Sequence, residues 1–444
     1  MDTTNCTCSG HLWACAVSGL LFSSISVAEA AEPAELKPVG PWRIAVSVRG
    51  GPAALKATLD VPPPDTVTVR DEKHKTLREF NPKRAGWTKG NPLTGVRACE
   101  CTVKGALDPS SLAVRHGTGP ETIQFEKGKD FDVDPHWATV GRLPEGRIKA
   151  DQPVFISYRY AKRRLDAVVL TEDGKILLVR GEPEVAMCRP PELPAGATHL
   201  ANIFISGMIP ALTADNLFPI LETAYPEPLK SVPSIAEARL PETMKKLRSG
   251  EPLTILAWGD SVTTFKRWQT MFVKRLQAKY PQAKINLVTE AWGGRNSGSY
   301  LAEPPGSPHN YKEKILARKP DLIVSEFVND AGLNPARVEK RYGKLLGDFK
   351  AIGAEWIILT PHYVIPSWMG LKSQRNVDQD PRPYVKGLRQ FTETHQVALA
   401  DASLRYGRLW RQGIPYLTLM ENNINHPNVF GHSLFADSLI ALFP

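Results

Sequence analysis

The chain has 444 residues, of which 42% are hydrophobic and 23% are charged, and its formal net charge is +9. This length is too great for one compact core, so we expect two domains after a short leader, and the composition is that of a globular chain rather than a disordered or membrane-embedded one. The basic residues are scattered and no nucleic-acid-binding motif accompanies them, so we expect no nucleic acid partner.

Residues 1–30 are predicted to be an export signal. Residues 12–27 form an apolar run, and an Ala-Glu-Ala tripeptide at residues 28–30 supplies the small-x-small site that a signal peptidase cleaves. The run is too short and too rich in Ser and Gly to span a bilayer, so we expect no membrane span. Asp2 and the absence of Lys or Arg before the run are atypical of such signals. The leader predicts a secreted or periplasmic protein.

Residues 31–234 are predicted to form an all-β, sandwich-like accessory domain. Short β-rich runs at residues 42–48, 153–160, 166–171 and 175–179 are separated by turn-forming residues. The last two runs flank an Asp-Gly pair, which indicates a β-hairpin. No long amphipathic helix is visible in this segment, which favours a β-sandwich.

Three cysteines follow the predicted leader, namely Cys99, Cys101 and Cys188. An odd number permits at most one intramolecular disulfide. Cys99 and Cys101 are too close in sequence for an easy bridge within one strand, so Cys188 is the expected partner of either. A Cys-x-Cys pair without a nearby His is a poor metal site. No cysteine follows Cys188, so the C-terminal half has no thiol nucleophile.

Strands and helices alternate throughout residues 235–444. The predicted strands lie at residues 253–258, 284–289, 321–326, 355–360 and 397–400, and the predicted helices at residues 235–248, 265–279, 311–317, 336–352, 382–395, 404–412 and 428–442. This alternation predicts a parallel sheet with helices on both faces, that is, a three-layer α/β domain. Ligands of such sheets bind beyond the carboxyl ends of the strands.

Ser261 directly follows the first of these strands, in the segment Ile-Leu-Ala-Trp-Gly-Asp-Ser-Val-Thr, and opens a helix. The backbone N–H groups at a helix N-terminus favour developing negative charge, which suits a nucleophile beside an oxyanion site. By itself, a Gly-Asp-Ser turn is more often an ordinary helix cap. The prediction of a nucleophile therefore depends on partners elsewhere in the chain.

Three later loops supply such partners. Gly294 follows the second strand and Asn329 follows the third, where a backbone N–H and a side-chain amide can donate to an oxyanion. His426 precedes the last helix, in the place of a general base for Ser261. Each residue alone is more typical of a turn or of the protein interior.

Together the four loops resemble the SGNH/GDSL hydrolase superfamily, whose blocks carry Ser, Gly, Asn and His in this order. The resemblance covers residues 250–444. It implies a flavodoxin-like parallel sheet, with Ser261 as nucleophile, His426 as base, and Ser261, Gly294 and Asn329 as the oxyanion hole.

Two positions depart from the pattern of the superfamily. Phe327 replaces the glycine of the third block, and Asn423 replaces the aspartate that precedes the catalytic histidine by three residues. An asparagine can orient an imidazole but cannot stabilise an imidazolium as a carboxylate does. Three explanations are open: Asn423 or a backbone carbonyl orients His426 in a Ser–His dyad, Glu421 supplies the carboxylate, or the site is inactive.

Other polar and aromatic side chains also fall near the predicted strand ends. Asp260 is expected to hold the nucleophile turn, and His432 to lie inside the last helix as a competing but less suitable base. His362 follows the fourth strand, where a place in the pocket and a structural role are equally expected. Indole rings stack well on sugars, and the tryptophans at strand ends are Trp258, Trp292 and Trp368.

The resemblance implies an exported serine carboxylic-ester hydrolase that needs no metal or cofactor. The Gly-Gly-Arg segment, the leader and the β-domain resemble carbohydrate O-acetylesterases more than lipases, so we expect a small-molecule or polysaccharide ester as substrate. Two alternatives are a catalytically degenerate domain in a carbohydrate-binding or adhesion protein, which Asn423 favours, and an O-acyltransferase of the same fold. The oligomeric state and the role of the β-domain do not follow from the sequence.

Overall fold

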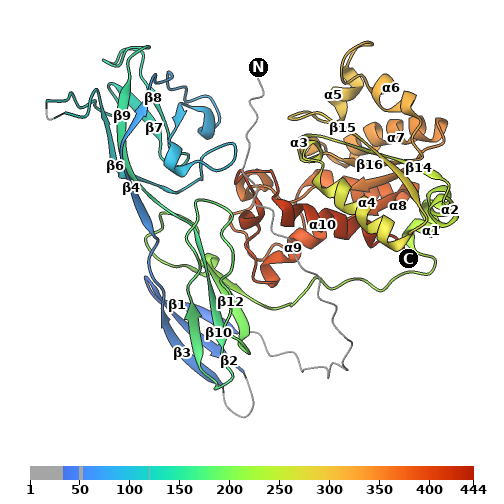
Figure 1. Cartoon of the computed structure of the whole chain (residues 1–444), viewed down its shortest axis with the longest axis horizontal. Helices are drawn as coiled ribbons and strands as arrows, with labels where there is room; N and C mark the ends of the chain where they lie inside the picture. Colours follow the sequence, from blue (N-terminus) through green and yellow to red (C-terminus); the bar gives the residue numbers. More distant parts are fainter. Residues whose placement is uncertain (1–33, 50–53, 120) are drawn as a thin grey trace.

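The computed structural model describes residues 34–49, 54–119 and 121–444, so the predicted export signal lies outside the described residues. The antiparallel strands lie on one side of the molecule, and an α/β unit with a parallel sheet lies on the other (Figure 1). None of the helices in the described ranges is long and apolar enough to cross a membrane.

The N-terminal half consists mostly of antiparallel strands, as predicted, but they form two β units rather than one sandwich. In the first β unit, the sheet β1-β2-β3 packs on the sheet β11-β10-β12-β13 around a core that includes Ile44, Val168 and Ile203. In the second β unit, the sheets β4-β9-β6 and β5-β8-β7 share a core that includes Val140 and Ile156. The strands are β1 (Glu35–Gly40), β2 (Arg43–Val48), β3 (Leu55–Asp60), β4 (Thr66–His74), β5 (Asn91–Pro92), β6 (Leu107–Arg115), β7 (Phe131–Asp134), β8 (Thr139–Arg142), β9 (Val154–Ala161), β10 (Arg164–Leu170), β11 (Ile176–Val179), β12 (Thr198–Ile205) and β13 (Leu217–Pro219).

The predicted β-hairpin is formed by β10 and β11, which pair in antiparallel register. The Thr171 N–H donates to the Lys175 carbonyl at 2.9 Å, and Gly174 adopts a φ of 80°, which glycine favours. The turn residues therefore set the register of this pair.

A five-stranded parallel sheet forms the centre of the C-terminal half, in the order β15-β14-β16-β17-β18. The second strand of this half, β15, lies at one edge and the first, β14, lies beside it, which is the flavodoxin-like order. The strands are β14 (Pro252–Gly259), β15 (Lys284–Ala291), β16 (Leu322–Glu326), β17 (Glu355–Leu359) and β18 (Ala398–Ala400).

Helices cover both faces of this sheet, which confirms the three-layer prediction (Figure 1). Successive residues of a strand point to opposite faces, so Ile255 and Ala257 lie in one core, whereas Leu256 and Trp258 lie in the other. The first core is covered by α1 (Ile235–Arg239), α2 (Pro241–Ser249), α4 (Arg267–Lys279), α9 (Ala402–Arg408) and α10 (Val429–Ile440), and the second by α5 (Ser297–Ala302), α6 (Tyr311–Lys314), α7 (Pro335–Ala351) and α8 (Pro383–His395).

The single helix predicted at residues 235–248 is divided into α1 and α2. Leu240 between them has non-helical dihedral angles, and Pro241 occupies the first position of α2. Proline has no backbone N–H to continue the ladder of α1, but it is favourable at the first position of a new helix.

The disulfide expected between Cys188 and Cys99 or Cys101 is wrong, because the structure records these residues as thiols. Cys188 is buried beside Leu165, and the Cys101 thiol donates to the Asn422 carbonyl at 2.7 Å. Burial raises the pKa of Cys101 and of Cys188 to about 12, so both remain protonated at neutral pH.

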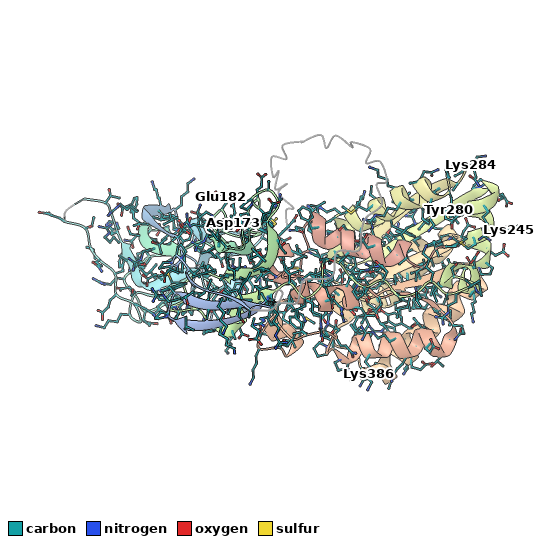
Figure 2. All side chains as sticks on the ribbon, turned by 90° about the horizontal axis from the view of Figure 1, so that it is seen from below. Asp173, Glu182, Lys245, Tyr280, Lys284 and Lys386 are labelled. Carbon is teal, nitrogen blue, oxygen red and sulfur yellow. The ribbon has the colours of Figure 1, made fainter. Side chains whose placement is uncertain are left out.

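The β units contact the α/β unit through two apolar clusters. Cys101 and Trp137 of the second β unit pack against Ile365 and Ile424. Trp410 packs with side chains of β10, β12 and β13 in the first β unit. Charged side chains are exposed on both halves of the molecule, as Figure 2 shows for Asp173 and Glu182 on the β side and for Lys245, Lys284 and Lys386 on the α/β side.

Candidate active site

Ser261 is the first residue of α3 (Ser261–Thr264), directly beyond the carboxyl end of β14. The preceding turn requires glycine at position 259. A Cβ added there would lie 2.2 Å from Thr263 Oγ1 and 2.4 Å from the Glu326 carbonyl oxygen. The close approach of β14, α3 and the end of β16 therefore places the serine hydroxyl at the edge of the sheet.

Asp260 lies beneath Ser261 and ties the nucleophile turn to the loop after β16. Its buried carboxylate accepts hydrogen bonds from the backbone N–H groups of Val262, at 3.1 Å, and Asn329, at 2.9 Å. Glu326 is also fully buried; Thr263 Oγ1 donates to its Oε2 at 3.4 Å, whereas its Oε1 has no hydrogen-bond partner in the described part of the chain. Burial raises the pKa of both carboxyl groups. Because Asp260 has two N–H donors, Glu326 is the member of the pair that stays protonated.

The imidazole of His426 contacts the nucleophile. Its Nε2 lies 2.9 Å from Ser261 Oγ, which is hydrogen-bond distance. Phe265 packs its ring against the imidazole with a centroid separation of 5.3 Å. The structure thus brings together two residues that the sequence assigned to separate loops.

Asn422 holds the loop that carries His426. Its side-chain oxygen accepts hydrogen bonds from the N–H groups of Ile424, at 3.0 Å, and of Asn425 and His426, each at 2.9 Å. The Glu421 N–H also donates to the His426 carbonyl at 2.8 Å. One buried amide therefore fixes the turn that presents the imidazole.

Neither Asn423 nor Glu421 contacts the His426 imidazole by a hydrogen bond or ion pair within the described residues. Asn423 has a φ of 58°, and its side-chain oxygen accepts from the buried guanidinium of Arg163. Glu421 forms an ion pair with Arg267 at 2.5 Å. The structure therefore does not place Asn423 where its side chain would orient the imidazole, and it directs the Glu421 carboxylate elsewhere.

A carboxylate from the N-terminal half lies beside the other ring nitrogen. Glu100 Oε2 is 2.6 Å from His426 Nδ1, although it lies off the direction of a ring N–H, and it accepts from the Asn422 amide at 2.9 Å. Burial alone would raise the pKa of Glu100, but the contacts with His426 and Asn422 outweigh it and lower the pKa. Sequence reasoning missed this residue, because Glu100 lies in the predicted β-domain, between Cys99 and Cys101 and far in sequence from the four blocks. The asparagine at position 423 was the one signal that a carboxylate had to come from elsewhere.

The loops after β15 and β16 flank Ser261. A Cβ added at Gly293 would lie 3.9 Å from Ser261 Cβ, so Gly293 lies beside the nucleophile, and the next residue, Gly294, has a φ of 72°. Asn329 is half-buried, and its side-chain amide donates to the Arg295 carbonyl at 3.2 Å. That bond uses one of the two amide hydrogens, which leaves the second for a ligand.

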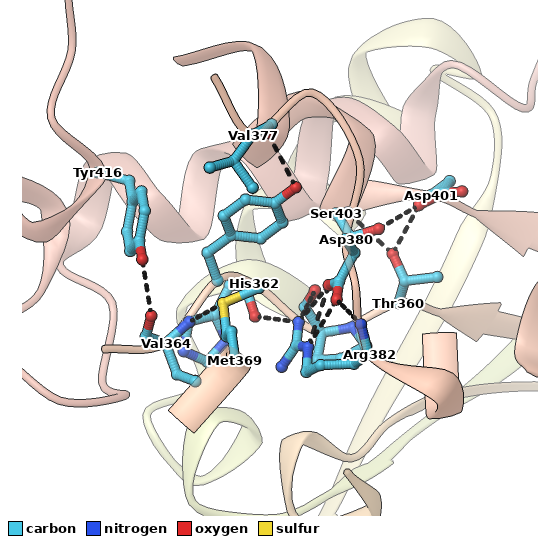
Figure 3. A network of polar contacts seen from close by, with 12 residues as sticks. Thr360, His362, Val364, Met369, Val377, Asp380, Arg382, Asp401, Ser403 and Tyr416 are labelled. Carbon is cyan, nitrogen blue, oxygen red and sulfur yellow. Dashed lines mark hydrogen bonds and ion pairs between the residues drawn. The ribbon is translucent and has the colours of Figure 1, made fainter. Parts of the chain in front are cut away.

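His362 lies behind the site in a buried polar network, which Figure 3 shows. Its Nε2 contacts the Asn425 carbonyl at 2.7 Å, and its own carbonyl accepts from Arg382, which is paired with Asp380. Burial lowers the pKa of His362 well below its usual value. The neutral ring therefore supports the loop of His426 from below, which is a structural role.

His432 lies within α10, as predicted, and is fully buried. Burial lowers its pKa to about 3, and neither ring nitrogen has a hydrogen-bond partner in the residues that the structure describes. It does not contact Ser261.

The three tryptophans at strand ends have different surroundings. Trp258 is fully buried in the core, and Trp292 stacks on His309 with a centroid separation of 4.5 Å. Trp368 is 52% exposed, and its ring lies 5.6 Å from that of Trp87 in the second β unit. Trp368 is therefore the most exposed of these three tryptophans, and Trp292 is partly exposed.

Across residues 34–49, 54–119 and 121–444, no group of three or more His, Cys, Asp or Glu side chains is placed to hold a metal ion.

Residues 255–434 match the model of the GDSL-like lipase/acylhydrolase family. The C-terminal half is a GDSL-like hydrolase domain. The resemblance found in the four sequence blocks is thereby confirmed, and the enzyme class is that of hydrolases acting on ester bonds. No curated protein matches the chain.

Several solved structures are similar to this chain or to part of it. The psychrotrophic esterase EstA from Pseudoalteromonas sp. is 20% identical with a TM-score of 0.30, and the match covers 42% of this chain and 93% of that one. A carbohydrate esterase of family 3 from Talaromyces cellulolyticus is 14% identical with a TM-score of 0.30, covering 42% and 93%. The protein YXIM from Bacillus subtilis is 14% identical with a TM-score of 0.32, covering 91% and 84%.

Proposed function

We propose that the protein is an exported serine carboxylic-ester hydrolase that removes O-acetyl groups from carbohydrates. The observation that carries the proposal is the 2.9 Å contact between Ser261 Oγ and His426 Nε2 at the carboxyl edge of the sheet of a GDSL-like domain. A nucleophile and a base within hydrogen-bond distance are the minimum that acyl transfer through a serine requires.

The reaction begins when Ser261 Oγ attacks the acyl carbonyl while His426 Nε2 takes the hydroxyl proton. The tetrahedral intermediate collapses, the proton passes from His426 to the departing alcohol oxygen, and the acyl group stays on Ser261. Water then attacks the acyl-serine as His426 takes its proton. The second collapse releases the carboxylic acid and returns the proton to Ser261.

The oxyanion formed in both steps would be held by three donors: the backbone N–H groups of Ser261 and Gly294 and the side-chain amide of Asn329. Support comes from the position of Gly293, which precedes Gly294 and lies beside Ser261, and from the second hydrogen of the Asn329 amide, which the Arg295 carbonyl does not accept. Asp260 reinforces the arrangement, because it accepts from the Asn329 N–H and thereby couples the Asn329 loop to the nucleophile turn. Donors fixed in this way need no rearrangement when charge develops, which is how an oxyanion hole accelerates the reaction.

A carbohydrate ester is favoured by the aromatic surface close to the loop of His426. Trp368 is half exposed, it lies beside Trp87, and the apolar cluster that includes Trp87 also contains Ile424 of the His426 loop. Exposed indole faces stack on the apolar faces of sugar rings. The Gly-Gly-Arg segment, by resemblance, and the predicted leader support the same assignment.

The test compares turnover of p-nitrophenyl acetate by the wild type, Ser261→Ala and His426→Ala, with Ser433→Ala on α10 as the matched serine control. We expect loss of turnover in the first two variants and wild-type turnover in the control. A fluorophosphonate probe should label the wild type and Ser433→Ala, should label His426→Ala much more slowly because its serine lacks the base, and should not label Ser261→Ala. Full activity in Ser261→Ala would overturn the nucleophile assignment.

The substrate class has its own test. Release of acetate from acetylated oligosaccharides should exceed turnover of p-nitrophenyl esters of long-chain fatty acids. Preference for the long-chain esters would replace the carbohydrate proposal with a lipase. Turnover of acetate donors only when a glycan acceptor is present would replace it with an O-acyltransferase.

The degenerate, carbohydrate-binding alternative depended on the lack of a carboxylate near His426. Glu100 lies at that place, at 2.6 Å from Nδ1, so this alternative has no specific observation in its favour.

A further inference from the structure

We propose that Glu100 of the second β unit is the positioning carboxylate of the catalytic site, so that residues from both halves of the chain form a Ser261–His426–Glu100 triad. This inference rests on the proposed function of Ser261 and His426. It gives the β half a direct role, namely to complete the site rather than only to bind ligand or cover a cleft.

The geometry of the imidazole supports this role. His426 Nε2 faces Ser261 Oγ at 2.9 Å, and Nδ1 faces Glu100 Oε2 at 2.6 Å. A carboxylate beside Nδ1 keeps the ring proton on that nitrogen, which leaves the lone pair of Nε2 free to accept the serine proton. Glu100 Oε2 lies off the ring N–H direction, and catalytic hydrogen bonds are commonly misaligned before substrate binds.

Asn422 links the carboxylate to the histidine loop. Its amide nitrogen donates to Glu100 Oε2 at 2.9 Å, while its amide oxygen accepts from the His426 N–H at 2.9 Å. Asn422 is itself buried, so it holds the acid and the base in one rigid arrangement. A surface ion pair formed by chance would lack such a shared anchor.

The segment that carries Glu100 is fastened to the same loop on both sides. The Cys99 N–H donates to the Glu421 carbonyl at 3.3 Å, and the Cys101 thiol donates to the Asn422 carbonyl at 2.7 Å. Cys101 is buried and packs against Ile424. The backbone of Glu100 is therefore held against residues 421–424 independently of its side chain.

Position 423 has a different task in this chain. Asn423 accepts from Arg163, which is fully buried between β9 and β10 and also donates to the Ser206 carbonyl at 3.2 Å. The neutral asparagine thereby joins the β half to the catalytic loop. The carboxylate of the triad comes from Glu100 instead, to which the side-chain amide of Asn422 donates.

Glu100 is less buried than the acid of a typical triad, since its side chain is 48% exposed. Solvent screens its charge, so its removal should cost less than the roughly 10⁴-fold loss seen for a buried triad aspartate. We expect Glu100→Gln to lower kcat by about 10²- to 10³-fold with little change in KM, because the variant lacks the negative charge that stabilises the imidazolium in the transition state.

The experiment measures kcat, KM and the pH–rate profile of the full-length protein with p-nitrophenyl acetate. The variants are Glu100→Gln, Glu100→Asp and Glu421→Gln, with the exposed Glu145→Gln as the matched control. In Glu100→Gln the ascending limb of the profile should move to lower pH, because a negative charge beside the imidazole is gone. Glu100→Asp should recover part of kcat, and Glu145→Gln should match the wild type.

Chemical rescue distinguishes the proposed positioning role of Glu100 from a purely structural role. Because Glu100 is half exposed, formate should restore part of the activity of Glu100→Ala but none of that of Ser261→Ala. Wild-type kcat and an unmoved profile in Glu100→Gln would overturn the inference, as would a moved profile in Glu421→Gln instead. If either result is found while Ser261→Ala is inactive, the role of Glu100 is wrong but the proposed function stands. Full activity in Ser261→Ala would overturn both the proposed function and the role of Glu100.

Discussion

Replacement of Glu326 by glutamine tests the protonation state of the buried carboxyl group beneath the nucleophile turn. Glu326 ends β16, is fully buried, and its Oε1 has no hydrogen-bond partner among the described residues. Burial, reinforced by the negative charge of Asp260, raises its pKa well above the ordinary value. Glutamine has nearly the same shape and stays neutral at every pH, so Glu326→Gln removes only the ability to ionise.

The magnitude follows from linkage between proton binding and folding. The pKa of Glu326 is higher in the folded protein than in the unfolded chain. The protonated carboxyl group therefore contributes its full stabilisation below the pKa of the unfolded chain, and this contribution is lost as pH rises through the pKa of the folded protein. Between those two values the unfolded chain releases the Glu326 proton while the folded chain retains it. Between the two pKa values, the free energy of unfolding of the wild type should therefore fall relative to that of Glu326→Gln, by up to about 1.4 kcal/mol per pH unit.

Urea denaturation of the two proteins at several pH values within this window measures the difference. The exposed Glu145→Gln serves as a control, for which the difference from the wild type should not depend on pH. A pH-independent difference between Glu326→Gln and the wild type would refute the reasoning, because it would mean that Glu326 is ionised in the folded protein.

Three further outcomes are expected. Asn329→Ala should lower kcat about 10²- to 10³-fold with little change in KM if its amide holds the oxyanion, and an unchanged kcat would contradict that role. Burial would raise the pKa of Glu72, but hydrogen bonds from His74, Thr94 and Tyr158 lower it to about 2. Glu72 therefore stabilises the fold above pH 4.5 by about 3 kcal/mol, and this contribution is lost as pH falls towards 2. Urea denaturation of Glu72→Gln at neutral pH should show that loss, and equal stability would refute it. Trp368→Ala should raise KM for acetylated oligosaccharides but not for p-nitrophenyl acetate, and equal effects on both substrates would exclude sugar stacking.

Much of the C-terminal half was predictable from local pattern. Alternating strands and helices indicate a parallel sheet, and in such a sheet the carboxyl ends of all strands meet at one edge. Residues that follow successive strands, such as Ser261, Gly294 and Asn329, therefore gather at this edge. The break between α1 and α2 was missed because the apolar periodicity continues across Pro241, although proline cannot continue the hydrogen-bond ladder.

The β half was less predictable, because pairings between antiparallel strands far apart in sequence depend on tertiary packing rather than on local propensity. The strand runs and the hairpin at Gly174 were predictable, but the division into two units was not. The cysteines show the same limit. Their number allowed a bridge, whereas packing buries Cys188 and directs the Cys101 thiol to the Asn422 carbonyl.

The sequence by itself determined the α/β class, the order of the four blocks, and the candidate pair of Ser261 and His426, because each depends on periodicity or on position relative to a strand end. Only the tertiary structure decided what lies on the other side of the imidazole. The contacts of Glu100 with His426 and of Arg163 with Asn423 join segments far apart in the chain. Such contacts arise when separately formed units pack together, and no local pattern encodes them.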